Sequence, residues 1–351
     1  MKQLYTFLLT TLFIVSLTAN SATRRTNGTG GGNWTDASTW ACGCIPSSSD
    51  DIILEATDTL TVDTTVTCDE FRYEYSDDGS RLVINNTRTL TTTSDFIIEE
   101  PNTSDATANI VIDGTLHIGN ATDDDFRIFG ELNEDNLTVN ITVNSTGLLD
   151  IDGGFTHTNY SGSPTNIVNI TSTGSIVIDG NLTSSIAATD CEFNLDIDGN
   201  FDAGAISVTF SAANGTFSGM YRGSADVDIT SYSLTFNGSG ATCTNTLLNG
   251  ANLSSTGVHN IDMNSAGDDA TVTWDIDGTY SCSRFSSKID GDNDTVTVVV
   301  RDDGTMRSNT KAEWRYGNSS DMLFDFDVES GGEYRSVTFT SFALGSSCTY
   351  D

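Results

Sequence analysis

Six cations gather late in the chain, in a region that also contains two aromatic residues. The cations are Arg284, Lys288, Arg301, Arg307, Lys311 and Arg315, and the aromatic residues are Trp314 and Tyr316. Lys and Arg together account for only 15 of the 351 residues, so a group of them is more informative than a group of acids. On one face of a fold they would form a groove that binds a glycan, or would supply the base of a polysaccharide lyase. Pairing with the surrounding Asp residues is the simpler alternative, and we favour it.

A second group of residues could hold a metal ion. Asp290, Asp292 and Asp294 place three carboxylates at alternate positions, as calcium-binding loops do. The segment departs from the EF-hand, because Arg301 stands where the bidentate Glu should be. Among cofactors, calcium fits this segment best, and an acidic ridge with only diffuse counterions is the alternative that we favour.

Pairs of Asp residues two positions apart also point to a divalent ion. Both members of such a pair lie on the same face of a strand, so stacking of the strands would crowd their charges. A divalent ion would relieve that repulsion. The pairs are Asp150/Asp152, Asp196/Asp198 and Asp275/Asp277.

Seven cysteines are spread over the chain: Cys42, Cys44, Cys68, Cys191, Cys243, Cys282 and Cys348. The spacing of Cys42 and Cys44 is too tight for the usual Cys-x-x-Cys metal or redox motif. Cys68 is the nearest partner for either residue, and the remaining four could link neighbouring layers of a stacked fold in an oxidising compartment. Zinc binding is the runner-up interpretation of the cysteines, and it is disfavoured because the three His residues lie far apart and near no Cys.

Acidic residues dominate the charge of the chain. The 49 Asp and Glu residues outnumber the 15 Lys and Arg residues, which gives a formal net charge of −34. Nucleic-acid binding requires a cationic surface and is excluded, and an anionic membrane would repel the chain. Asp makes up most of the acid and favours turns, so the abundance of Asp, Asn, Thr, Ser and Gly indicates strands and turns rather than helices.

The start of the chain, residues 1–21, predicts a secretory signal peptide. Lys2 precedes an apolar run over residues 4–17, and small residues follow at Ala19, Ser21 and Ala22. The run is short for a membrane span, which needs roughly 20 apolar residues, so cleavage is expected rather than anchoring. The mature protein should be secreted or attached to the cell surface, without membrane insertion.

A phrase of the form Ile-Asp-Gly recurs through the body of the chain. A strand followed by an Asp-Gly turn, in which Gly supplies a positive φ, fits the corner of a stacked coil. The spacings between copies indicate a parallel β-solenoid with irregular coils of roughly 20–30 residues. The intervals that carry this estimate run from Asp152 to Asp179, from Asp179 to Asp198 and from Asp277 to Asp303.

Two stretches interrupt this spacing. The interval from Asp113 to Asp152 is longer than the others, so it would need one coil with an insertion or two short coils. The stretch from Asp198 to Asp277 lacks the phrase but continues in strand-like pieces, which fit about three degenerate coils.

We therefore predict an all-β protein. Its body, residues 101–351, would be a β-solenoid, preceded over residues 22–100 by a capping segment and the first coils. An array of β-sandwiches is the rival fold, but it would require more even strand spacing and Pro-bearing linkers, and the chain has only 3 Pro. The chain stops without an evident cap, so the solenoid is expected to continue into a further polypeptide or to bind a partner at its open end.

The opening of the mature chain carries a family resemblance. Trp34 and Trp40 stand close together, followed by a turn at Pro46, the acidic pair Asp50-Asp51 and a β-branched strand. This order resembles the start of secreted β-helical surface proteins of Bacteroidetes-type bacteria, and of the related domain named for its eight glycines. The resemblance implies a right-handed parallel β-helix with a cap at its start. It also implies surface adhesion or, in some members, activity on polysaccharides.

The cap has five expected structural residues: Trp34, Trp40, Cys42, Cys44 and Cys68. The two Trp side chains are large apolar bodies in a polar segment, so they are expected to plug the open end of the core. Stacking on sugar rings is the alternative. Cys42 and Cys44 depart from the simple pattern of the family.

Pairs of Thr two residues apart occur at four places, which are Thr65/Thr67, Thr271/Thr273, Thr295/Thr297 and Thr338/Thr340. A flat array of such pairs would suggest ice binding. The pairs do not hold one period along the chain, so the β-propensity of Thr is the better explanation.

These features predict an exported, non-catalytic β-solenoid that acts as an adhesin or structural module. Its partner would be an extracellular glycan or a surface protein. The sequence contains no Gly-x-Ser-x-Gly elbow and no phosphate-binding loop. The alternative is a carbohydrate-active β-helix, a polysaccharide lyase or hydrolase, that uses the late basic and aromatic residues.

Overall fold

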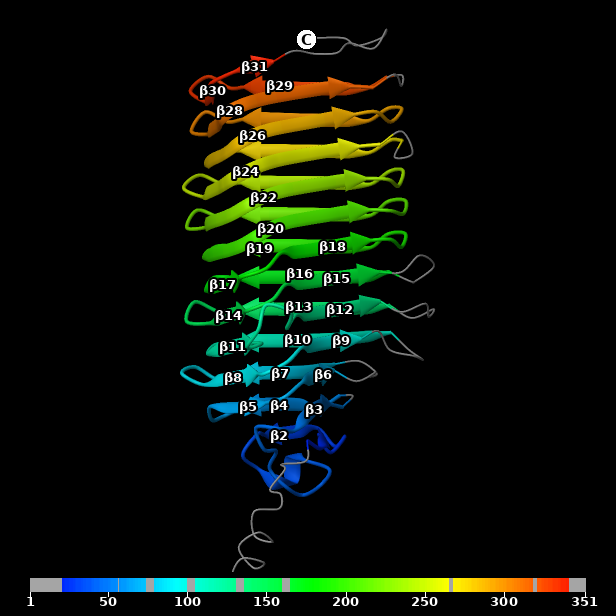
Figure 1. Cartoon of the computed structure of the whole chain (residues 1–351), viewed down its shortest axis with the longest axis vertical. Coiled ribbons are helices and arrows are strands. Elements are labelled where there is room, and N and C mark those ends of the chain that lie inside the picture. Colours follow the sequence, from blue (N-terminus) through cyan, green and yellow to red (C-terminus); the bar gives the residue numbers. More distant parts are fainter. Residues whose placement is uncertain are drawn as a thin grey trace, which may run out of the picture.

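The computed structural model describes residues 21–55, 57–73, 79–99, 105–130, 136–159, 165–264, 268–317 and 321–340. Within them the chain winds into an elongated column of about 11 stacked turns, with the N-terminal coils at one end and the C-terminal coils at the other (Figure 1). The pairings between its strands are parallel, as in β10 (Ala106–Ile112) with β13 (Leu137–Val143). This confirms the predicted parallel β-solenoid and contradicts an array of antiparallel sandwiches.

The described residues contain no α-helix, and their one helical element is a 3₁₀ turn, η1 (Ala37–Thr39). None of their helices is therefore long and apolar enough to cross a membrane.

One sheet of the solenoid has 12 strands, and successive coils contribute its neighbouring strands. Residues along each strand alternate between the core and the outer surface. The strands are β2 (Gly31–Asn33), β4 (Thr59–Val62), β7 (Ser80–Ile84), β10, β13, β16 (Asn166–Ser172), β19 (Glu192–Ile197), β21 (Thr216–Tyr221), β23 (Thr242–Leu247), β25 (Thr271–Ile276), β27 (Thr295–Val300) and β29 (Leu323–Val328).

The other sheet has 19 strands and begins as two separate rows of short strands. One row is β1 (Thr23–Arg25), β3 (Asp51–Leu54), β6 (Phe71–Tyr73), β9 (Phe96–Glu99), β12 (Phe126–Gly130), β15 (Phe155–Asn159) and β18 (Leu182–Ile186). The second row is β5 (Val66–Cys68), β8 (Thr89–Thr92), β11 (Thr115–Ile118), β14 (Leu148–Ile151) and β17 (Ser175–Ile178).

The two rows merge at β20 (Asn200–Phe210), whose halves pair with β17 and β18. From there each coil contributes one long, bent strand to this sheet: β22 (Asp226–Phe236), β24 (Asn252–Met263), β26 (Thr279–Ile289) and β28 (Thr305–Tyr316). The short strands β30 (Glu333–Ser336) and β31 (Phe339–Thr340) pair with the two halves of β28.

The Ile-Asp-Gly phrase marks two different corners of the coil, which corrects our interpretation of the long interval between Asp113 and Asp152. Asp113 lies between β10 and β11, whereas Asp152 lies between β14 and β15, so the two copies do not delimit whole coils. The true coil length is given by the column of asparagines on β10, β13, β16 and β19, whose successive members are 31, 29 and 25 residues apart. The predicted three coils do separate Ile197 from Ile276.

Glycine in these corners permits close stacking of coils rather than a positive φ. The glycines of the phrase are absent from the residues with positive φ. A Cβ at Gly199 would lie 1.9 Å from the carbonyl oxygen of Gly174 in the neighbouring coil, and one at Gly114 would lie 2.2 Å from that of Arg88. Any side chain there would push the coils apart.

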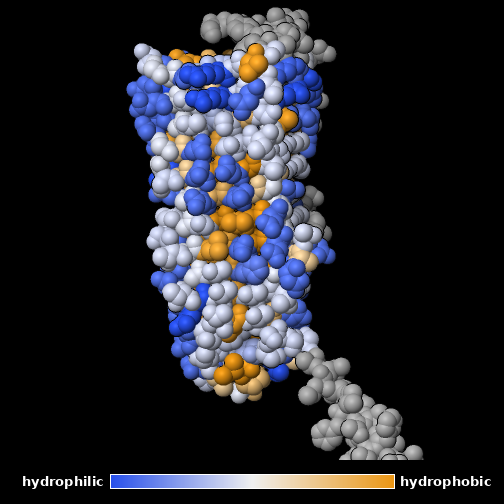
Figure 2. Space-filling view, turned by 60° about the vertical axis from the view of Figure 1, so that its left-hand side comes forward, coloured by the Kyte–Doolittle hydropathy of each residue, from blue (hydrophilic) through white to orange (hydrophobic). Residues whose placement is uncertain are grey.

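A single apolar core runs the length of the column. Its N-terminal half contains a ladder of phenylalanines from successive coils, Phe71, Phe96, Phe126 and Phe155, with ring centroids 4.9, 4.8 and 4.9 Å apart. The outer surface is mostly polar, and on the face shown in Figure 2 the apolar residues form a narrow, interrupted stripe.

Trp34 and Trp40 belong to the N-terminal end of this core, as predicted. They are 1% and 2% exposed, and their rings make a T-shaped contact with centroids 5.1 Å apart. Trp40 Nε1 donates a hydrogen bond to the carbonyl oxygen of Trp34 at 3.0 Å. Their burial contradicts the alternative that they stack on sugar rings.

The cysteine prediction is wrong about the partners. Cys42 forms a disulfide with Cys44, so neither pairs with Cys68. Cys68, Cys243 and Cys282 are buried thiols rather than links between layers. Cys191 is buried as well, and its Sγ accepts the backbone N–H of a neighbouring coil. Cys348 lies outside the described residues.

Candidate functional site

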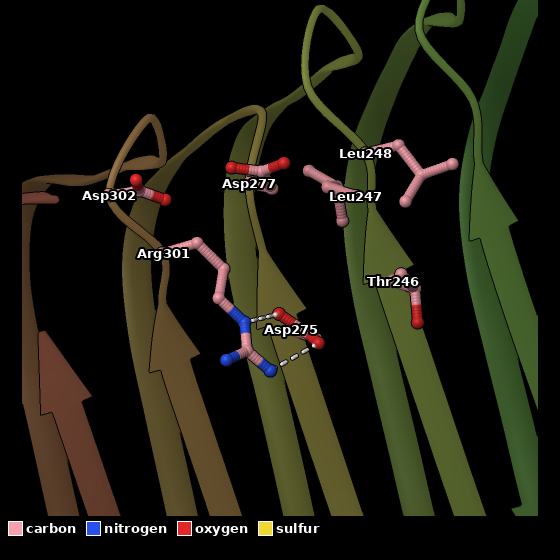
Figure 3. A pocket seen from close by; sticks show the side chains of 7 residues that line it. All are labelled: Thr246, Leu247, Leu248, Asp275, Asp277, Arg301 and Asp302. Atoms are coloured by element: carbon pink, nitrogen blue, oxygen red, sulfur yellow. Dashed lines mark hydrogen bonds and ion pairs between the residues drawn. The ribbon is translucent and has the colours of Figure 1, made fainter. Parts of the chain in front are cut away.

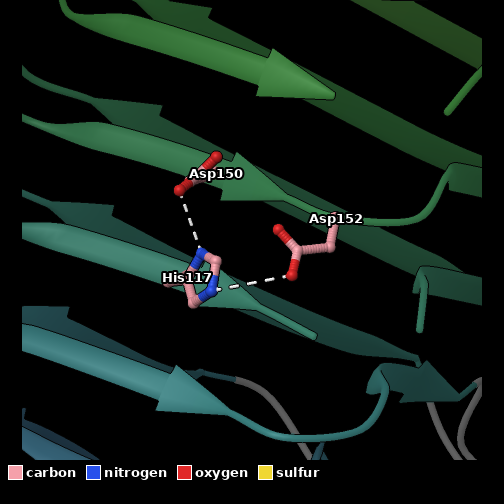
Figure 4. Close-up of side chains that lie close together, drawn as sticks. All are labelled: His117, Asp150 and Asp152. Atoms are coloured by element: carbon pink, nitrogen blue, oxygen red, sulfur yellow. Dashed lines mark hydrogen bonds and ion pairs between the residues drawn. The ribbon is translucent and has the colours of Figure 1, made fainter. Parts of the chain in front are cut away.

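Three titratable side chains meet on the outer face of the 19-stranded sheet. His117 on β11 is the register partner of Asp150 on β14 in the next coil, and Asp152 follows β14 at the corner. His117 Nδ1 lies 2.9 Å from Asp150 Oδ2, and His117 Nε2 lies 3.8 Å from Asp152 Oδ2 (Figure 4). The three side chains are 29%, 34% and 30% exposed, so dissolved ions can reach them.

This group is a possible metal-binding site. One ring nitrogen and one oxygen from each carboxylate lie within 4.8 Å of one another, and no other set of three such side chains does so within the described ranges. An imidazole nitrogen combined with carboxylate oxygens is a ligand set for zinc and similar ions. Calcium instead takes six to eight oxygen ligands.

Sequence reasoning found two of these three residues. It singled out Asp150 and Asp152 as a pair that a divalent ion could neutralise, but it set His117 aside for want of a nearby His or Cys. The overlooked signal was the correspondence between two strands. His117 stands between Leu116 and Ile118 just as Asp150 stands between two apolar residues in the next coil.

The carboxylates of Asp290, Asp292 and Asp294 are not among the described groups that converge within 4.8 Å of one another, so the calcium loop stays a prediction. Asp294 is buried and accepts the backbone N–H groups of Ala270 and Gly291 at 3.0 and 2.9 Å. Burial raises the pKa of this carboxyl to about 6. Its role is to satisfy the backbone of the corner between two coils.

In each of the other two Asp pairs, one carboxylate is paired with an arginine. Arg222 donates two hydrogen bonds to Asp196, both at 2.6 Å. Arg301 donates two to Asp275, at 2.7 and 2.9 Å (Figure 3). It donates a third to Glu329 at 2.7 Å. Arg301 therefore sits beside the 12-stranded sheet, apart from the other late cations on the 19-stranded sheet.

Four of the late cations share the outer face of β26 and β28, where Arg284 is the register partner of Lys311 and Lys288 that of Arg315. Glu313 lies between Lys311 and Arg315 on β28. It pairs with Arg315 at 2.6 Å, with Lys311 at 3.1 Å and with Arg284. The hydrogen bond from Arg315, assisted by the other two cations, holds the pKa of Glu313 at about 2. We call Arg284, Lys311, Arg315 and Glu313 the basic patch.

Lys288 and Arg307 flank the basic patch. Lys288 pairs with Asp262 at 3.3 Å and with Asp290 at 3.6 Å. Arg307 lies on β28 as the register partner of Ser281. Five of the six late cations thus form ion pairs with carboxylates. This is the pairing with acidic residues that we favoured from the sequence over a glycan-binding groove.

The aromatic residues predicted to accompany these cations lie elsewhere. Trp314 is 2% exposed and packs in the core, with its ring centroid 5.0 Å from that of Phe324. It therefore cannot stack on a sugar. Tyr316 is the last residue of β28, and its side chain lies outside the described part of the structure.

Comparisons of the chain with protein-family models, with curated proteins and with solved structures found no match. The structure therefore establishes a β-solenoid fold and no family. The resemblance of the opening to secreted β-helical surface proteins stays a prediction.

Proposed function

We propose that this chain is an exported, non-catalytic β-solenoid that acts as a cell-surface adhesin or structural module and binds an acidic extracellular glycan. Export rests on the signal-peptide pattern of the sequence, of which residues 1–20 lie outside the described residues. The glycan partner rests on one observation, the basic patch, where cations from two neighbouring coils surround a single carboxylate.

The basic patch is positive on a strongly negative protein. Three cations and one carboxylate give it a net charge of +2, by three minus one, whereas the whole chain carries −34. The side chains of Arg284, Lys311 and Arg315 are 35%, 33% and 56% exposed, so they retain N–H groups that face solvent. Carboxylate or sulfate groups of a polysaccharide would accept charge-assisted hydrogen bonds from them.

Neutral polar side chains extend from the basic patch along the column. In register with Glu313 lie, coil by coil, Ser286, which is buried, and then the partly exposed Asn260, Ser233, Ser207, Thr183 and Thr156. Their hydroxyl and amide groups both donate and accept hydrogen bonds, as sugar hydroxyls do. This track supports an extended polymer, lying across several coils, as the ligand.

Replacing Lys311 and Arg315 together with Gln is expected to weaken binding of an acidic polysaccharide such as polygalacturonate by about tenfold or more for each cation removed, because each lost charged hydrogen bond contributes about 1.5–3 kcal/mol. Binding of the wild-type protein should also weaken as salt rises. Isothermal titration calorimetry at two salt concentrations measures both effects.

The matched control is Arg222→Gln, which removes a cation of the same kind beside the 12-stranded sheet and should leave this binding unchanged. Equal binding by the Lys311/Arg315 double variant and the wild type would contradict the glycan proposal. Release of reducing ends or of unsaturated uronates from the polysaccharide would support the carbohydrate-active alternative instead.

We also propose that His117, Asp150 and Asp152 bind a zinc ion, in place of the calcium expected from the sequence. The ring nitrogen favours zinc over calcium. Zinc binds His and Asp at about 2.0–2.2 Å, so small side-chain rotations would bring the three ligand atoms around one ion. Such an ion would join two neighbouring coils, since His117 and Asp150 lie on adjacent strands.

Zinc at 100 times its dissociation constant is expected to stabilise the wild-type protein by about 2.7 kcal/mol, because it binds only the folded chain. His117→Asn should abolish this gain, and calcium should not produce it. Asp202→Asn is the matched control, because Asp202 lies in the same register column as Asp150, two coils further along the solenoid. Thermal melting with zinc, calcium or chelator tests the site, and an equal response of His117→Asn and the wild type would contradict it.

A further inference from the structure

Threonine side chains form a regular array on the outer face of the 12-stranded sheet. Two columns run across the four consecutive strands β21, β23, β25 and β27, and adjacent members are register partners. Seven of the eight members are Thr. The columns are Thr216, Thr242, Thr271 and Thr295, and Ser218, Thr244, Thr273 and Thr297. We call these eight residues the threonine array.

Two of the Thr pairs named from the sequence, Thr271/Thr273 and Thr295/Thr297, align in register in the fold despite their irregular spacing along the chain. Thr295 follows Thr271 by a shorter stretch of chain than Thr271 follows Thr242, yet the three occupy one column. The corners of the coils absorb the difference in length, while parallel strand pairing keeps the columns aligned. The other two pairs named from the sequence, Thr65/Thr67 and Thr338/Thr340, lie at β5 and β31 of the 19-stranded sheet and do not belong to the array.

The hydroxyl groups of the threonine array have no partners in the described part of the protein. All eight side chains are partly exposed, and none makes a side-chain hydrogen bond to another described residue. The second column continues into Asn194, Asn169, Asn140 and Asn109, whose amide groups do bond one another, at 3.0, 2.9 and 3.1 Å. The asparagine amide groups thus form hydrogen bonds with one another, whereas the hydroxyl groups of the threonine array face solvent.

The array is rigid, periodic and uncharged. Neighbouring strands lie about 4.7–4.9 Å apart, and residues two positions apart along a strand lie about 6.6 Å apart. β-Branched Thr has a restricted χ1, so its hydroxyl and methyl groups keep fixed directions. None of the eight positions is acidic, although the chain contains 49 Asp and Glu residues.

We propose that the threonine array binds the surface of an ice crystal. A two-dimensional grid of hydroxyls offers hydrogen bonds to an ordered layer of water, and the methyl groups between them fit against that layer without binding it. A charged side chain would instead hold its own hydration shell. A glycan suits this face less well, because the array has no charge to pair with it and no aromatic ring on which a sugar could stack.

The test compares thermal hysteresis and ice recrystallisation of the purified full chain and two variants. Thr273→Tyr places a bulky ring at the centre of the array and is expected to lower the hysteresis at equal concentration about tenfold, as for a tenfold loss in affinity. Tyr has a high β-propensity, so the strand should persist, which circular dichroism and melting would verify. Thr273→Val, which removes only the hydroxyl, should lower the activity by less.

The control is Thr209→Tyr on the 19-stranded sheet. Thr209 belongs to a separate hydroxyl column, with Thr158, Ser185 and Thr235, and its replacement leaves the threonine array intact. Full ice activity in this variant supports the proposal. Absence of hysteresis in the wild type, or a loss in Thr209→Tyr equal to that in Thr273→Tyr, overturns it. Neither result depends on the glycan-binding function.

Discussion

Phe126→Ala is expected to lower the free energy of unfolding by about 3–5 kcal/mol. Phe126 is fully buried and stacks between Phe96 and Phe155, with ring centroids 4.8 and 4.9 Å away. Both partners belong to neighbouring coils, so the truncation leaves a cavity on both sides. The coils hold each other mainly through nearest-neighbour contacts, and the loss therefore weakens two interfaces at once.

Denaturant unfolding followed by tryptophan fluorescence measures this loss, since Trp34 and Trp40 lie in the same continuous core. Phe126→Leu is the matched control and should cost less than about 1.5 kcal/mol, because it keeps most of the volume. A cost of Phe126→Ala close to that of the Leu variant would show that the ladder contributes little. A broadened transition, rather than a shifted one, would show that the N-terminal coils unfold separately.

Stability is expected to fall as pH is lowered from 6.5 towards 4, because two buried histidines resist protonation in the folded chain. Burial lowers the pKa of His157 to about 4 and that of His259 to about 3. His157 Nδ1 lies 2.9 Å from Ser184 Oγ, and the Tyr280 hydroxyl lies 2.5 Å from His259 Nδ1. Both rings are therefore fixed inside the core as neutral groups.

The sign follows from proton counting. Between the lowered pKa values and the ordinary value of 6.5, the unfolded chain binds protons that the folded chain does not, so acid favours unfolding. The stabilisation is fully present above pH 6.5. Where both histidines are protonated only in the unfolded chain, they contribute a slope of about 2.7 kcal/mol per pH unit. Below pH 6 the raised pKa of Asp294 opposes this contribution by up to about half, because the folded chain then binds a proton that the unfolded chain does not.

Unfolding free energies measured from pH 7 to pH 4.5 test this slope. His157→Asn should lower the slope by about 1.4 kcal/mol per pH unit, since one of the two histidine protons is no longer taken up. Thr156→Ala, on the outer face beside His157, should keep the wild-type slope. An unchanged slope in His157→Asn would assign the acid sensitivity to the many carboxylates instead.

The fold class could be predicted from the sequence because it is encoded in short segments. Apolar residues alternate with Thr, Asn and Asp along each strand, and corners interrupt the strands at intervals of a few residues. The coil length followed from the intervals that join equivalent corners, Asp152 to Asp179 and Asp277 to Asp303, whereas the interval from Asp179 to Asp198 joins two different corners. The burial of Trp34 and Trp40 followed from their size in an otherwise polar segment.

The arrangement of the functional groups could not be predicted, because it depends on which residues of different coils lie side by side. His117 meets Asp150 33 residues away, and Arg284 meets Glu313 29 residues away. Corners of variable length separate such partners, so no constant period in the sequence reveals them. Hydrogen bonding between parallel strands and packing of the inward side chains set the register, and both arise only when the coils stack.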